Sequence, residues 1–187
     1  MRKQPFVLGI LVCACAAAAH AEEIPVRPDP EETHHLSISG SRDEGYTVRT
    51  TGTDPYVFTE TLPETWDSER QVILSFETFS LTGTDSFQVF FLPPMTERHS
   101  VKMEGLPVSE GWSGVSIDLS ESDRWHSGVR RLRLDFGNHP GRTAQVRRLR
   151  LRERTAVEQR QARQREDRRR RLTQRAHDLE QYLRESF

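Results

Sequence analysis

Residues 129–137 read Val-Arg-Arg-Leu-Arg-Leu-Asp-Phe-Gly, and this stretch decides the fold. The apolar side chains fall on one phase of a two-residue repeat: Leu132, Leu134 and Phe136. The charged side chains fall on the other phase: Arg131, Arg133 and Asp135. Because successive side chains point to opposite faces of a β-strand, the segment predicts a strand that lines a core with one face and shows charge on the other.

The segments around this strand indicate a two-layer β-sandwich. Ser86–Leu92 has apolar residues on both phases, which is typical of a strand covered on both sides, whereas Gly114–Leu119 alternates like a half-exposed strand. We predict strands at Leu36–Ser39, Tyr46–Thr50, Tyr56–Thr59, Gln71–Ser80, Ser86–Leu92, Ser100–Met103, Gly114–Leu119, Val129–Phe136 and Gln145–Leu151. In the last of these Val146 is out of phase with Leu149 and Leu151, which predicts a β-bulge. The pattern favours an all-β sandwich of jelly-roll type, with a β-barrel as the alternative.

The composition changes after Arg152. From Thr155 to Glu185 the chain has no Gly or Pro and is rich in strong helix formers, so we predict one long C-terminal helix. Thr155 and Glu158 have the spacing of a capping box. Leu172, Ala176, Leu179 and Leu183 form a single apolar stripe, for which we expect packing on the chain's own sandwich or on another helix. A short homodimeric coiled coil is the alternative.

The N-terminal residues resemble a cleavable secretory signal peptide. Arg2 and Lys3 precede an apolar run that ends at Ala19-His20-Ala21, and the run is shorter than a bilayer span, so we expect no transmembrane helix after cleavage. The expected location is the periplasm, the cell surface or the extracellular space. Lipidation at Cys15 is the alternative. Since Cys13 and Cys15 both lie in this segment, the mature chain has no thiol for catalysis or zinc binding.

These patterns divide the chain into four parts. Residues 1–21 form the signal peptide, and residues 22–34, with Pro25, Pro28 and Pro30 among acidic side chains, are expected to form an extended lead-in. Residues 35–152 form the sandwich, and residues 153–187 form the Arg-rich helix. The net charge of -1 with 34% hydrophobic and 29% charged residues suits a globular domain with a polar appendage.

Catalytic signatures are absent from the sequence. It contains no nucleophile elbow, phosphate-binding loop or HExxH motif, and the spacing of its carboxylates selects no pair for glycoside hydrolysis. Arg168–Arg171 lies beside Glu166 and Asp167, so we interpret it as a solvated helix face and expect no nucleic-acid partner. Binding to an anionic polysaccharide or to phospholipid head groups is the alternative for this run. We therefore expect a protein that is not an enzyme.

Four segments together carry a family resemblance. They are residues 51–57 (Thr-Gly-Thr-Asp-Pro-Tyr-Val), 88–91 (Gln-Val-Phe-Phe), 111–119 with Trp112 and Asp118-Leu119, and 125–137 with Trp125 and Leu-Arg-Leu-Asp-Phe-Gly. Their order resembles the galactose-binding-domain-like β-sandwich modules, similar to carbohydrate-binding modules, that bacteria attach to secreted glycan-degrading enzymes. The resemblance spans residues 36–152. Residues 146–149 (Val-Arg-Arg-Leu) depart from the last strand of related modules in their polar residues.

The resemblance implies an exported, non-catalytic carbohydrate-binding or accessory module whose partner is a polysaccharide or other glycan. Sugars bind where exposed aromatic rings lie beside polar groups, so the expected site joins loop and strand residues: Tyr56, Trp66, Trp125, Asn138 and Arg142. The alternative for each tryptophan is a structural place in the core or at an edge of the sandwich. No cofactor is required, although a structural calcium ion held by Asp43, Glu44 and Asp135 is a further hypothesis. The alternative function is an interaction protein whose sandwich presents the helix to a partner protein or to a second copy of the chain.

Overall fold

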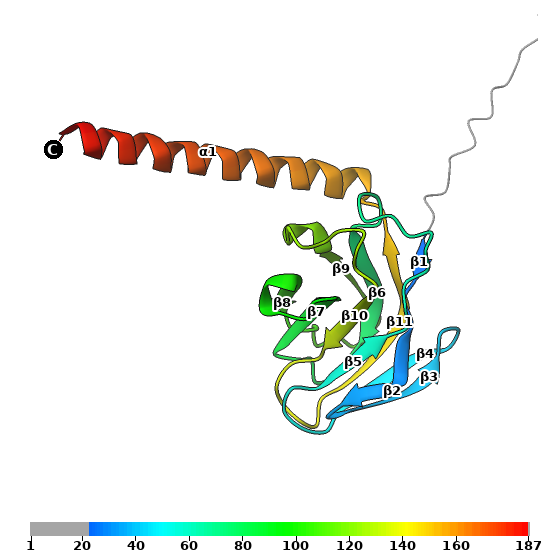
Figure 1. Cartoon of the computed structure of the whole chain (residues 1–187). Coiled ribbons are helices and arrows are strands. Elements are labelled where there is room, and N and C mark those ends of the chain that lie inside the picture. Colours follow the sequence, from blue (N-terminus) through cyan, green and yellow to red (C-terminus); the bar gives the residue numbers. More distant parts are fainter. Residues whose placement is uncertain (1–22, 187) are drawn as a thin grey trace, which may run out of the picture.

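The computed structural model describes residues 23–186, which form two antiparallel β-sheets packed face to face and one long helix (Figure 1). The six-stranded sheet has the order β3-β4-β11-β6-β9, with β1 paired to β11 beside this path, and the five-stranded sheet has the order β2-β5-β10-β7-β8. The predicted all-β sandwich followed by a C-terminal helix is therefore confirmed. The signal peptide and the alternative lipidation site lie outside the described residues.

The elements have the following bounds. The strands are β1 (Ile24–Pro25), β2 (Pro28–His34), β3 (Leu36–Ser41), β4 (Gly45–Thr50), β5 (Tyr56–Thr59), β6 (Ile73–Phe79), β7 (Ser86–Leu92), β8 (Ser100–Glu104), β9 (Ser113–Asp118), β10 (Arg131–Asp135) and β11 (Thr143–Arg152). The helices are η1 (Glu97–His99), η2 (Leu119–Glu121) and α1 (Ala156–Ser186). Each strand predicted from the sequence corresponds to one of β3 to β11.

The core lies between the sheets and follows the alternation seen in the sequence. In β10, Leu132 and Leu134 are fully buried, and in β7 the residues Phe87, Val89 and Phe91 point into the same core. The second apolar phase of β7 includes Phe90, which is buried on the outer side of the sheet and is absent from the core cluster. This strand is thus covered on both faces, as its pattern predicts.

The prediction of an extended lead-in over residues 22–34 is wrong for the described part of that segment. β1 pairs with β11, and β2 forms an edge of the five-stranded sheet against β5. Ile24 and Val26 are 2% exposed, so this segment closes one side of the core. Prolines are tolerated here because an edge strand needs ladder hydrogen bonds on one side only.

The predicted bulge in β11 is confirmed. The pairing of β11 with β6 shifts register between Arg147 and Arg150, and Arg148 has a φ angle of 56°. The extra residue restores Leu149 and Leu151 to the core side after Val146.

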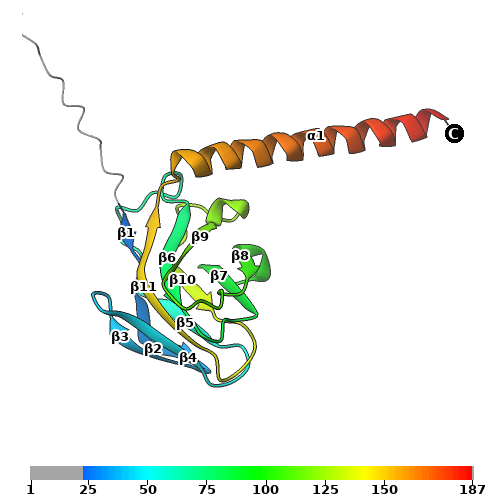
Figure 2. The same ribbon diagram turned by 180° about the vertical axis from the view of Figure 1, so that it is seen from behind.

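The helix α1 begins with the predicted capping box. The backbone N–H of Thr155 donates to Glu158 Oε2 at 2.7 Å, and the backbone N–H of Glu158 donates to Thr155 Oγ1 at 3.3 Å. Beyond this first part the helix extends away from the sandwich, as both ribbon views show (Figures 1 and 2). Leu172, Leu179 and Leu183 are 57%, 60% and 49% exposed, so the expected packing of the apolar stripe on the chain's own sandwich is wrong.

No helix within residues 23–186 combines the length and the apolar character needed to cross a bilayer.

Candidate functional site

The two tryptophans predicted to form an exposed platform are buried. Trp66 is 6% exposed and Trp125 is 8% exposed, and their ring centroids lie 5.0 Å apart within the core. Trp125 also contacts Phe91 edge-on at 5.1 Å. Their loops fold inward because large apolar rings gain more from burial than from solvent contact, so neither ring is available as a platform.

Asn138 and Arg142 lie in the loop between β10 and β11, where their contacts are structural. The backbone N–H of Asn138 donates to Asp85 Oδ1 at 3.1 Å, and Arg142 Nη1 donates to the carbonyl oxygen of Thr82 at 3.0 Å. These two residues tie their loop to the loop between β6 and β7. Of the five predicted site residues, only Tyr56 lies on an aromatic surface.

The predicted calcium ligands do not fit a metal site. Asp43 and Glu44 lie in the turn between β3 and β4, whereas Asp135 lies on β10 of the other sheet and is bound by Arg133. Among residues 23–186, no three His, Cys, Asp or Glu side chains group closely enough to hold a metal ion.

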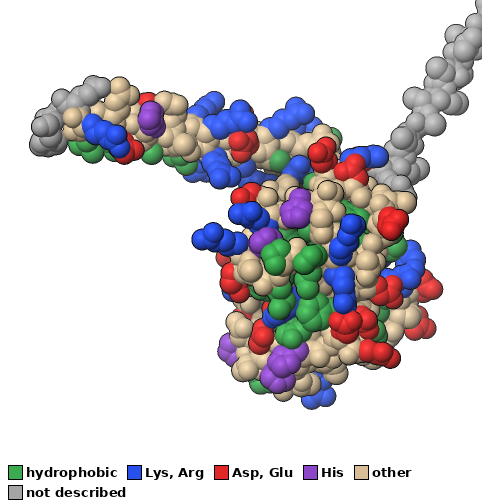
Figure 3. Space-filling model, viewed as in Figure 1, with side chains coloured by type: hydrophobic (Ala, Val, Ile, Leu, Met, Phe, Trp, Pro, Cys, Tyr) green, Lys and Arg blue, Asp and Glu red, His purple; other side chains and the backbone are tan. Residues whose placement is uncertain are grey.

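A surface with a different composition covers the outer side of the five-stranded sheet. We call it the aromatic–arginine face; it consists of His34, Tyr56, Phe58, Gln88, Phe90, Arg131, Arg133 and Asp135. These side chains stand on four neighbouring strands, in the order β2, β5, β10 and β7. Figure 3 shows hydrophobic side chains gathered at the centre of this side of the sandwich, with charged and histidine side chains around them.

Arg133 is the centre of this face. Its Nε donates to Asp135 Oδ1 at 2.7 Å, and its Nη2 donates to Asp135 Oδ2 at 2.6 Å and to Asp54 Oδ1 at 2.8 Å. The guanidinium lies 3.7 Å from the centroid of Tyr56 and 5.0 Å from that of Phe90. Because Arg133 is only 9% exposed and fully engaged, it fixes the positions of its neighbours and offers little surface of its own.

Burial also affects Asp135 on this face. Burial raises the pKa of Asp135, and the hydrogen bonds from Arg133 oppose that rise only in part. The carboxylate therefore depends on Arg133 to remain charged, so these two side chains form one structural unit.

The accessible groups of the face surround this unit. His34 stacks on Tyr56 with centroids 5.1 Å apart, and since β2 and β10 flank β5, the two faces of the Tyr56 ring are covered by His34 and Arg133. Tyr56 thus presents its ring edge and hydroxyl. Phe58 is turned 73° from Tyr56, and the guanidinium of Arg131 lies 5.3 Å from its centroid.

Polar groups flank these rings on both sides. The side chains of Asp54 and Arg131 are 60% and 28% exposed. Asp54 Oδ1 accepts from Arg133, and Arg131 donates through Nε to the Thr59 carbonyl oxygen and pairs through Nη2 with Glu32, so Asp54 Oδ2 and Arg131 Nη1 are the atoms that each offers to a ligand. Gln88 Nε2 donates to Glu97 Oε2 at 3.0 Å and to Ser100 Oγ at 2.8 Å, which orients its amide. The face therefore combines apolar ring surface with donors and acceptors fixed in place, which suits a ligand carrying both C–H groups and hydroxyls.

A second aromatic group lies on the opposite side of the sandwich. Trp112 is 39% exposed, the guanidinium of Arg147 lies 3.9 Å from its ring centroid, and Glu77 accepts a hydrogen bond from Arg147 Nε at 2.7 Å. That hydrogen bond is the main reason that the pKa of Glu77 is lowered. Trp112 is the exposed tryptophan of this chain, in contrast to the two chosen from the sequence.

No protein-family model and no curated protein matches the sequence. Among solved structures, the fold is similar to a family 29 carbohydrate-binding module from Piromyces equi, with a TM-score of 0.50 and 8% identity over 74% of this chain and 94% of that module.

Two further carbohydrate-binding modules have a similar fold with lower TM-scores. One is the C-terminal family 6 carbohydrate-binding module of a laminarinase from Zobellia galactanivorans, with a TM-score of 0.40 and 12% identity over 67% of this chain and 94% of that module. The other is the family 30 module of a cellulosomal cellulase from Clostridium thermocellum, with a TM-score of 0.41 and 12% identity over 71% of this chain and 94% of that module. The similarity to the family 29 module supports the predicted resemblance at the level of the β-sandwich fold.

Proposed function

We propose that this chain is a non-catalytic carbohydrate-binding module and that the aromatic–arginine face is its glycan-binding surface. The observation that carries the proposal is the grouping of half-buried rings with fixed polar groups on one sheet of a sandwich. The similarity in fold to a carbohydrate-binding module supports it.

The contacts that the face offers suggest how a glycan would bind. The ring of Phe58 and the edge of Tyr56 would pack against the C–H groups of a sugar ring. The Tyr56 hydroxyl, Arg131 and Asp54 would exchange hydrogen bonds with its hydroxyls. Arg133 and Asp135 would act as positioning residues, because their polar atoms are already engaged with each other.

We further propose that the module acts outside the cytoplasm and is linked to glycan recognition or degradation. The apolar run before Ala19-His20-Ala21 supports export. Intact mass of the mature chain tests this point, because export by the secretory route predicts a mass that begins at Glu22. A mass beginning at an acylated Cys15 would show instead that the mature protein is a lipoprotein.

Affinity gel electrophoresis of the full chain against a panel of neutral and anionic polysaccharides tests the binding proposal. Phe58→Ala removes ring surface, and Tyr56→Phe removes only a hydroxyl. We expect Phe58→Ala to weaken binding about tenfold, which corresponds to about 1.4 kcal/mol, and Tyr56→Phe to weaken it less.

Trp112→Ala is the matched control, since it removes an exposed ring from the opposite side of the sandwich. It should leave binding unchanged. Binding that depends on Trp112 and not on Phe58 would move the site to the other sheet, and a panel with no binder would reject the function.

One observation favours a second candidate function, in which the sandwich presents α1 to a partner protein or to a second copy of the chain. The apolar side chains of Leu172, Leu179 and Leu183 are exposed along one side of the helix. Sedimentation of the full chain at high micromolar concentration tests self-association. A monomer would exclude the second copy as the partner.

A further inference from the structure

The helix α1 carries arginines that have no acidic partner within the described residues. Arg165, Arg170 and Arg184 form ion pairs with acidic side chains. A second group forms no ion pair in the part of the chain that the structure describes, and it comprises Arg160, Arg163, Arg168, Arg169, Arg171 and Arg175. Unpaired guanidinium groups on one element are a source of uncompensated positive potential.

Helical geometry gathers most of these arginines on one side. At 3.6 residues per turn, five of them fall within about 140° of the helix circumference, and we call this the arginine face: Arg160, Arg163, Arg168, Arg171 and Arg175. It extends for about 22 Å along the axis at 1.5 Å per residue. Asp167 and Asp178 also lie on this side, so positive side chains outnumber negative ones.

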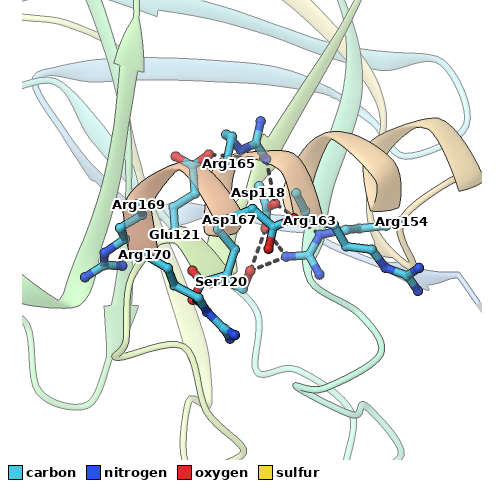
Figure 4. Close-up of a pocket in the computed structure, with 11 residues that line it drawn as sticks. Asp118, Ser120, Glu121, Arg154, Arg163, Arg165, Asp167, Arg169 and Arg170 are labelled. Carbon is cyan, nitrogen blue, oxygen red and sulfur yellow. Dashed lines mark hydrogen bonds and ion pairs between the residues drawn. The ribbon is translucent and has the colours of Figure 1, made fainter. Parts of the chain in front are cut away.

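The start of the helix is fixed to the sandwich by ion pairs. Arg154 Nη2 donates to Asp118 Oδ1 at 2.8 Å, and Arg165 Nη2 donates to Asp118 Oδ2 at 3.2 Å (Figure 4). Arg152 and Glu158 form a second, bidentate pair at 2.7 and 2.8 Å. The arginine face is therefore held in a defined direction relative to the sandwich.

The direction of the arginine face favours an extended anionic chain over a flat anionic bilayer as its ligand. Arg165, which contacts the sandwich, lies within about 60° of the apolar stripe, so Leu172, Leu179 and Leu183 point toward the sandwich side of the helix. A flat bilayer that inserted this stripe would meet the sandwich. Arg163 lies at the edge of the arginine face and lines the hollow beside Asp118 and Ser120 of the sandwich (Figure 4). The rest of the face points away from the sandwich, and Figure 3 shows positive side chains along the upper edge of the helix. The side chains that an extended chain can reach there are exposed: Arg160, Arg168, Arg171 and Arg175.

We propose that the arginine face of α1 binds an anionic polysaccharide that carries carboxylate or sulfate groups. Guanidinium groups match carboxylate and sulfate oxygens with paired hydrogen bonds, and five of them along about 22 Å suit a polymer with repeated charges better than a single small anion. The contact is electrostatic and does not depend on the aromatic–arginine face.

The experiment measures binding of the full chain to heparin, a sulfated probe, and to polygalacturonate, a carboxylated probe, with dextran as a neutral reference. Replacing the five arginines of the arginine face with glutamine keeps a strong helix former at each position. We expect this variant to lose at least about tenfold in affinity at 50 mM salt, and the unaltered chain to lose at least about tenfold between 50 and 200 mM salt.

The matched control replaces exposed arginines of the sandwich with glutamine and removes the same charge: Arg42, Arg49, Arg98, Arg124 and Arg130. It should bind both anionic probes nearly as well as the unaltered chain, and circular dichroism should show equal helix content in all three proteins. Equal loss in the control, or no binding of either probe at 50 mM salt, would overturn the proposal.

Two further binding measurements compare other polyanions with the polysaccharides. Tighter binding to phosphatidylglycerol vesicles or to duplex DNA than to both polysaccharides, with the same dependence on the five arginines, would overturn the choice of ligand. Phe58→Ala should retain heparin binding, so this proposal and the proposed function fail independently.

Discussion

Replacement of Trp125 by alanine should strongly destabilise the sandwich. The ring is 8% exposed and packs between Trp66 at 5.0 Å and Phe91 at 5.1 Å between ring centroids. Removing a buried aromatic side chain leaves a cavity, and such changes cost about 3–5 kcal/mol of unfolding free energy. A loss of that size would consume much of the stability of an ordinary domain.

Replacement of the same residue by phenylalanine should cost much less. The indole Nε1 of Trp125 is buried and has no hydrogen-bond partner among the described residues, so Trp125→Phe loses no hydrogen bond. We expect a cost of about 1–2 kcal/mol from the smaller ring. The control Trp112→Ala, at a ring that is 39% exposed, should cost less than about 1 kcal/mol.

Equilibrium urea denaturation, followed by tryptophan fluorescence and circular dichroism, measures these differences as shifts in the midpoint. A Trp125→Ala variant as stable as the unaltered chain, with lost glycan binding, would refute the core position of this ring and restore it to the site predicted from the sequence.

Three further predictions concern the ends of the fold and the helix anchor. Ile24→Ala should cost about 2–4 kcal/mol in the same denaturation assay, because this side chain is 2% exposed in β1; a cost near zero would mean that the segment does not close the core. Hydrogen bonds from Arg152, and then from Thr155, lower the pKa of Glu158 to about 2, so its contribution to the start of α1 is fully present above its ordinary pKa of 4.5 and is lost as pH falls toward 2. Helix content measured by circular dichroism should fall over that range. The Glu158→Gln variant should have a lower helix content than the unaltered chain at neutral pH and should not lose more as the pH falls. Identical acid titrations of the two proteins would contradict this role of Glu158. Asp118→Asn removes the acceptor charge for Arg154 and Arg165, so amide hydrogen exchange should quicken in residues 156–166 and stay unchanged in β10, and protection that is equal throughout would show that the anchor contributes nothing.

The strands and the helix could be predicted because their patterns are local. Alternation in residues 131–136 and the change to helix formers after Arg152 each reflect one period, and the capping box and the bulge in β11 also depend on neighbouring residues only. β1 and β2 escaped prediction for the opposite reason. Their prolines and acidic residues are typical of an extended segment, and they become strands only because β11 and β5 offer edges to pair with.

The site was predicted less well because exposure is a property of the tertiary structure. Trp66 and Trp125 lie in segments that read as loops, and nothing in their immediate neighbours indicates that the two rings meet. Trp112 has no neighbouring residues that set it apart from Trp66 and Trp125, yet its ring is exposed. Arg133 and Asp135 could be assigned to an outer face from the alternation, but the stacking of Arg133 on Tyr56 depends on the pairing of β10 with β5.

The outer side of the five-stranded sheet is the surface that we propose binds a glycan. Amide chemical shifts of the full chain, titrated with a soluble oligosaccharide of the best binder in the polysaccharide panel, test this binding most directly. Glycan binding at this surface predicts that the largest shift changes fall on β5, β10 and the adjoining part of β7, around Tyr56, Phe58, Arg131 and Gln88. Changes centred on Trp112 and β9, with β5 and β10 undisturbed, would contradict it.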